Sequence, residues 1–214
     1  MQDSRVVTSK TKRNPVPGDH RACFAWITAA FAFSLLFASS CGGSLFHVKP
    51  VAALPPLPAT VASANLGSIS FRAAPMLTDE ETQELFEANL QLAGLLPVRV
   101  EIRHNGGDAI ELKKIRFRLT DSAGTKWKAV SAKQAIARIL KANGVSLYNP
   151  SSRKTFEQEF RAYELNLNSP LTHAEGRREG FIIFLSPEKA AVSSPRGLVL
   201  NIEGLAQPAT LNLN

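Results

Sequence analysis

The sequence predicts a mainly β domain of the α+β class, an antiparallel β-sandwich with an N-terminal helix and a two-helix insertion. Three observations lead to this prediction. Apolar and polar residues alternate over several short segments after residue 67. Turn sequences such as 105–108 (Asn-Gly-Gly-Asp) and 121–124 (Asp-Ser-Ala-Gly) separate these segments. Two capping boxes mark helix starts between the strands.

Residues 1–41 have the composition of an export signal. The run Ala22–Ser40 has no charged side chain, and basic residues outnumber acidic ones ahead of it. A basic segment, an apolar run and small residues before a cleavage point are the parts of such a signal. Because Cys41 follows the small residues 38–40, this end of the run resembles the lipobox of bacterial lipoproteins. That resemblance implies that the Cys41 thiol is lipidated and that Cys41 becomes the first residue of the mature chain.

An uncleaved signal anchor is the alternative, since about twenty apolar residues are enough to span a bilayer. Both interpretations place the remaining chain outside the cytoplasm, because positive charge stays on the inner side. We therefore expect a lipid-anchored protein of the bacterial cell envelope, attached to the membrane through Cys41. By resemblance to envelope sorting rules, Gly42 after the cysteine favours the outer membrane where the cell has one.

The part after the leader is long enough for one domain with its own core, which we expect over residues 67–214. The whole chain has a formal net charge of +7. Without the five basic and two acidic residues of 1–41, 20 basic and 16 acidic residues remain, a net charge of +4. This mild excess gives no argument for nucleic acid as a partner. Both cysteines, Cys23 and Cys41, lie in the leader, so no disulfide is expected in the domain.

A Pro/Ala-rich tether is expected over residues 42–66, where four prolines and a single charged residue, Lys49, lie among small and apolar residues. Alternation over 67–73 then predicts a half-buried strand. Residues 78–81 (Thr-Asp-Glu-Glu) form a capping box and predict a helix that runs towards Gly94.

Val98, Val100 and Ile102 alternate with charged residues and predict a strand with one buried face. The parity of the apolar residues changes after Leu112. Within one continuous strand, such a one-residue slip would turn every later side chain to the other face. We therefore expect a bend at residues 113–114, where a strand of a sandwich would cross to the second sheet.

The clearest hairpin joins residues 115–120 to 125–130 through the turn 121–124. Its register sets Leu119 opposite Trp127 on the inner face. It also sets Arg118 opposite Lys128 on the outer face, and like charges opposed across a sheet cost stability. The outer face is either a contact surface for anionic headgroups or another envelope protein, or a solvated face neutralised by acids from neighbouring strands. The cations on that face are Lys114, Arg116, Arg118, Lys126 and Lys128.

A helical insertion is expected over about residues 131–165. The capping box of residues 131–134 (Ser-Ala-Lys-Gln) begins one helix, and aromatic residues at helical spacing over 156–163 indicate a second. The apolar run Gly180–Leu185 has to be covered on both faces and therefore predicts the central strand. Residues 198–202 alternate again as a further strand.

Residues 98–107, 117–124, 171–184 and 198–200 resemble the immunoglobulin-like β-sandwich domains of unknown function that are common in bacterial lipoproteins. The shared features are an inward-alternating strand, an Asn-Gly turn, a Phe-x-Leu-x-Asp-x-x-Gly hairpin and a late strand that begins with glycine, aliphatic and aromatic residues. The resemblance implies an immunoglobulin-like sandwich and carries no catalytic residues.

No catalytic, cofactor or metal site is predicted. His104 with Asp108, and His173 with Glu175, each provide two possible ligands, whereas metal sites generally need three or four. We therefore expect an envelope protein that acts as a binding or structural module and not as an enzyme.

The alternative is an envelope hydrolase or ligand carrier. Its pocket would lie between the helical insertion and the sheets, lined by Tyr148, Arg153 or Tyr163.

Overall fold

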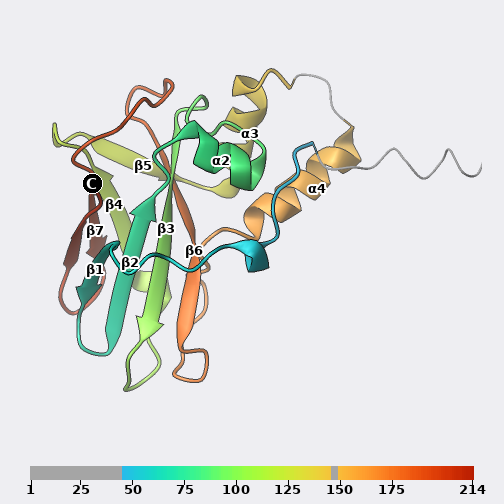
Figure 1. Cartoon of the computed structure of the whole chain (residues 1–214). Helices are drawn as coiled ribbons and strands as arrows, with labels where there is room; N and C mark the ends of the chain where they lie inside the picture. Colours follow the sequence, from blue (N-terminus) through green and yellow to red (C-terminus); the bar gives the residue numbers. More distant parts are fainter. Residues whose placement is uncertain (1–44, 146–148) are drawn as a thin grey trace, which may run out of the picture. The chain divides into compact units, whose positions relative to one another are not determined.

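The computed structural model describes residues 45–145 and 149–214, which belong to a unit spanning residues 42–214 (Figure 1). Its strands form one eight-stranded antiparallel sheet in the order β1-β2-β3-β6-β5-β4-β7-β8. The two strands at the ends of this order, β1 and β8, contact each other, so the sheet is nearly closed into a barrel. The strands are β1 (Ala62–Asn65), β2 (Ile69–Pro75), β3 (Leu95–His104), β4 (Arg116–Thr120), β5 (Lys126–Val130), β6 (Arg177–Leu185), β7 (Val199–Glu203) and β8 (Ala209–Asn212).

The predicted two-sheet sandwich, and with it the immunoglobulin-like arrangement, is wrong. Strand β5 pairs with β4 up to Trp127 and with β6 from Lys128 onward, so hydrogen bonding continues without a break between the two halves of the sheet. The bend expected at residues 113–114 is present as a 3-10 turn, Leu112–Lys114, and β4 after it pairs with β5 and β7. Sandwiches and barrels show the same alternation of buried and exposed residues, so the pattern alone does not separate them.

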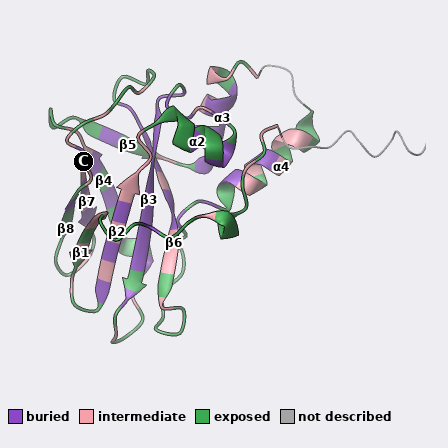
Figure 2. Cartoon of the chain, in the orientation of Figure 1, coloured by how far each residue is buried: buried purple, intermediate pink, exposed green. Residues whose placement is uncertain are grey.

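Strand β6 lies between two apolar clusters, as its continuous apolar run predicts. Phe184 faces the barrel interior with the inward residues of β2, β3, β4 and β7. Phe181, Ile183 and Leu185 face outward and pack beneath the helices. Figure 2 shows that β3, the partner of β6, is buried over most of its length. The prediction of a central strand covered on both faces is confirmed.

Three α-helices cover the outer face of the sheet beside β3 and β6: α2 (Asp79–Phe86), α3 (Ala132–Ala142) and α4 (Pro150–Arg161). The capping boxes predicted for α2 and α3 are both present. Helix α2 ends before the predicted stop at Gly94, because Glu87 adopts a left-handed conformation at φ 51°. No helix within residues 45–145 and 149–214 is long and apolar enough to cross a bilayer.

The segment of residues 45–61, which we call the strap, crosses the outer face of β2, β3 and β6 (Figure 1). Phe46 lies against Phe156 of α4, with 5.0 Å between ring centroids. The Lys49 amide donates to the Leu85 carbonyl at 2.9 Å, and Leu57 is buried. Most of the predicted tether therefore contacts the domain in this structure, and its last residues form β1.

After α4 the chain runs along β6 at very short range. Residues 163–165 bridge to Phe181, with the Leu165 amide 3.0 Å from the Phe181 carbonyl oxygen. A Cβ atom added to Gly180 would lie 2.6 Å from the Leu165 Cα atom. Only glycine at position 180 lets these two backbones meet without a shift.

Gly180→Ala is expected to lower the free energy of unfolding by about 2 kcal/mol, because overpacking forces one backbone away from the other. Urea unfolding measures this loss. Gly67→Ala is the control, since its Cβ would meet open space and only the left-handed backbone, at φ 76°, costs about 1 kcal/mol. Equal losses in the two variants would show that the contact at Gly180 is not rigid.

Candidate functional site

A pocket of about 260 Å³ opens in the barrel wall between the start of β4, strand β6 and the chain after α4. Its lining is apolar except for Arg116, Glu164 and the phenol of Tyr163. The aromatic members of the lining are Phe86, Phe117, Phe160, Tyr163 and Phe181.

The pocket exists because β5 changes partners. Trp127 pairs with Leu119 of β4 and is buried in the barrel, as the predicted register required. Ala129 has the same parity but pairs with Phe184 of β6, and its small side chain stays exposed at the pocket. Strands β4 and β6 are therefore not joined directly below β5, and the space between them is left open.

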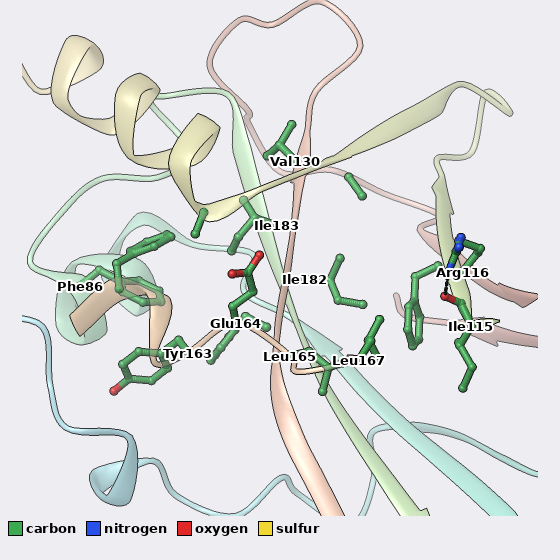
Figure 3. A pocket seen from close by; sticks show the side chains of 15 residues that line it. Phe86, Ile115, Arg116, Val130, Tyr163, Glu164, Leu165, Leu167, Ile182 and Ile183 are labelled. Atoms are coloured by element: carbon green, nitrogen blue, oxygen red, sulfur yellow. Dashed lines mark hydrogen bonds between the residues drawn. The ribbon is translucent and has the colours of Figure 1, made fainter. Parts of the chain in front are cut away.

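Glu164 reaches the pocket because of strand-like alternation after α4. Tyr163 and Leu165 are buried, and Glu164 between them is exposed. Figure 3 shows the Glu164 carboxylate directed towards Ile183, with Arg116 on the other side of the cavity. Burial raises the pKa of the Tyr163 phenol, which donates its hydrogen bond to the Lys49 carbonyl of the strap.

The two charged groups of the pocket differ in their partners. The Arg116 guanidinium donates to the carbonyl oxygens of Lys113 at 2.6 Å and Ile115 at 2.9 Å. Among the described residues, the Glu164 carboxylate has neither a hydrogen bond nor an ion pair. A ligand therefore meets a carboxylate that is free to accept and a guanidinium of which one nitrogen, Nη1, is already engaged.

A network of charges lies beside the strap on the outer face of β2, β3 and β6. The Glu101 carboxylate, only 2 % exposed, is at its centre. It accepts from Arg103 at 2.8 Å, Arg72 at 3.2 Å and Arg177 at 3.4 Å. Burial alone would raise the pKa of Glu101, but the Arg103 and Arg72 guanidinium groups outweigh it and hold that pKa below its usual value.

A second ion pair, between Arg99 and Glu179, lies next to this network. Both residues line a space of about 380 Å³ under the strap, together with Tyr163. The Arg72 guanidinium also donates to the Leu57 carbonyl of the strap at 2.8 Å. These contacts fasten the strap to the sheet.

Glu101→Gln is expected to lower the free energy of unfolding by about 3 kcal/mol at pH 7, because the arginines lose a buried counter-charge. The folded-state pKa of Glu101 is depressed, so its contribution is complete above the unfolded pKa of about 4.3 and is lost as the pH falls through the folded value. The difference between parent and variant, measured by urea unfolding, should therefore shrink below about pH 4.3. Glu188→Gln, on an exposed loop, is the control. A difference that stays constant from neutral to acidic pH would contradict this account.

The two histidines considered as metal ligands, His104 at the end of β3 and His173 in the loop before β6, lie close together. His104 and His173 lie 5.6 Å apart between ring centroids. The His104 ring contacts the backbone carbonyl of Asp108, and Glu175 pairs with Arg178. Within the described parts of the chain, no three His, Cys, Asp or Glu side chains are grouped as a metal site.

The five cations of the predicted basic face do not form one block. Lys128 pairs in register with Leu185 of β6 and not with Arg118 of β4. The Arg118 guanidinium is 3.0 Å from Glu203 of β7, so a neighbouring strand supplies an acid. Lys126 lies opposite Thr120 and is exposed, and Lys114 belongs to the 3-10 turn. Arg116 of this set lines the pocket described above.

The other predicted site residues do not form one site among the described residues. Cys41 and Tyr148 lie outside the described residues. Tyr163 lines the pocket, whereas Arg153 lies in α4 and pairs with Glu157 at 2.7 Å. The sequence did not identify Glu164 or Ala129 as site residues. The available signal for Ala129 was a small residue at an inward-facing position of a strand; Glu164 carried none.

No known protein family, curated protein or solved structure gave a significant match to this chain.

Proposed function

We propose that this protein is a lipid-anchored envelope protein that binds a small, largely apolar ligand in the pocket between β4, β6 and the chain after α4. The observation that carries the proposal is the opening in the barrel wall at Ala129. Small-molecule sites are concave and mostly apolar, with a few polar groups that orient the ligand. A volume of about 260 Å³ is just below the range of about 300–1,000 Å³ typical of such sites, which favours a compact ligand.

The pocket supports binding better than catalysis. Nucleophilic catalysis uses a nucleophile within hydrogen-bond reach of a base. The lining contains no Ser, Thr, Cys, His or Lys, and the Glu164 carboxylate has no partner among the described residues. Of the two alternatives raised by the sequence, a ligand carrier therefore has more support than a hydrolase.

The envelope location comes from the leader sequence. The charge-free run Ala22–Ser40 and the cysteine after it support export and lipidation at Cys41. Leu45, the first described residue, packs against the cluster beneath the helices and lies four positions after Cys41 in the sequence.

Ala129→Leu should weaken ligand binding at least tenfold, because the added methyl groups occupy the space left open below β5. Titration of the neutral probe 2-(hydroxymethyl)naphthalene, followed by ligand-observed NMR, measures the affinity. Ala206→Leu, in the exposed β7–β8 loop, is the matched control. Undiminished binding by the folded Ala129→Leu variant would place the probe elsewhere and remove the support for this pocket.

Cys41→Ala should leave the protein with its leader attached and without lipid. Intact mass of the membrane-extracted parent should correspond to a chain that begins at Cys41 and carries acyl groups. Cys23→Ala, within the apolar run, is the control and should be processed like the parent. A Cys41→Ala variant with the same mass processing and membrane fractionation as the parent would disprove the lipid anchor but leave ligand binding untouched.

A further inference from the structure

The carboxylate of Glu164 is the only acidic group of the pocket lining, and it has no hydrogen-bond or ion-pair partner among the described residues. Every carboxylate in the network around Glu101 is matched by arginines, so partners for acids are common elsewhere on this sheet. A carboxylate that lines an apolar cavity without a partner favours a ligand that brings the opposite charge.

The aromatic wall of the pocket favours the same charge. Phe86 packs edge to face on Phe181 and at a tilt on Phe160, with ring centroids 5.9 and 5.1 Å apart. Tyr163 lies 5.8 Å from Phe181 between ring centroids. Aromatic faces attract cations through their quadrupole, most strongly where water is excluded. A cation here would be attracted both by the ring faces and by the carboxylate.

Arg116 does not reverse this preference. Its guanidinium is held by the carbonyl oxygens of Lys113 and Ile115, and its parity in β4 is that of the outward-facing side chains. Because both carbonyls are bonded to Nη1, an anionic ligand would be left with Nε and Nη2 of a side chain that has the outward-facing parity. It would also approach the unpaired carboxylate of Glu164, at a cost in affinity.

We propose that the pocket selects ligands that carry a protonated amine on a compact apolar body, with the ammonium group paired to the Glu164 carboxylate. This inference rests on the proposed function, since it specifies the ligand class for the same pocket. The apolar body would lie against Ile182, Ile183 and Leu167, and the ammonium group would lie between Glu164 and the aromatic wall.

Three probes with one apolar body and different charges test the proposal: 2-(aminomethyl)naphthalene, 2-(hydroxymethyl)naphthalene and 2-naphthoate. At neutral pH and low salt, the amine should bind at least tenfold more tightly than the alcohol, and the carboxylate should bind most weakly. Added salt should reduce the advantage of the amine, because Glu164 is an exposed residue.

Glu164→Gln keeps the shape of the side chain and removes its charge, so amine and alcohol should then bind within about twofold of each other. Glu164→Lys should shift the preference to 2-naphthoate. The matched control Glu188→Gln, on an exposed loop, should bind all three probes like the parent. Thermal unfolding of each variant shows that the comparison is made between folded proteins.

The outcomes separate this inference from the proposed function. If the parent binds amine and alcohol equally, or if Glu164→Gln keeps the full preference for the amine, the charge selection is wrong while the pocket remains a binding site. If none of the three probes binds, both the charge selection and the proposed binding function fail.

Discussion

The change of partner within β5 is the constraint on which this structure depends. A strand of five residues hydrogen-bonds to β4 at one end and to β6 at the other, and it thereby joins all eight strands into one sheet. The same change leaves β4 and β6 apart on one side of β5. The continuity of the sheet and the opening in its wall therefore both follow from the offset pairing of β5, which pairs with β4 through residues 126–127 and with β6 through residues 128–130.

The chain after α4 partly fills that opening. Its backbone reaches β6 because Gly180 has no side chain, and the resulting bridge fixes the alternation of residues 163–165. Tyr163 packs in the cluster beneath the helices and Leu165 packs in the barrel core, whereas Glu164 lines the cavity. The position of the Glu164 carboxylate in the pocket is thus a consequence of backbone packing.

The ion network on the outer face has a different role. Glu101 is contacted by arginines from β2, from its own strand β3 and from β6. A buried ion pair is weak evidence for stability, because desolvation offsets much of the attraction. Here one carboxylate between three strands penalises any slip of register among them, since a slip would bury it without its partners. The strap lies beside this network and is tied to it through Arg72.

Much of the local structure could be predicted from the residues alone. The capping boxes of α2 and α3, the opposition of Leu119 and Trp127, and the two-sided burial of β6 each depend on contacts close in sequence or on periodicity. The end of α2 was misplaced because Leu90 and Ala93 are buried like helix residues although they lie beyond the left-handed Glu87.

The sequence by itself thus determined most of the strands and helices, because these follow from side-chain period and capping. It missed β1, which lies in the expected tether, and the burial of the second face of β3, where Arg99 and Glu101 are buried by contacts with distant residues. Only the tertiary structure decided between a sandwich and a nearly closed barrel, since both bury one face of each strand. It also decided the pocket, because Ala129 and Glu164 line a cavity only where β4 and β6 are separated. These two strands flank β5 in the sheet but are far apart from each other in sequence.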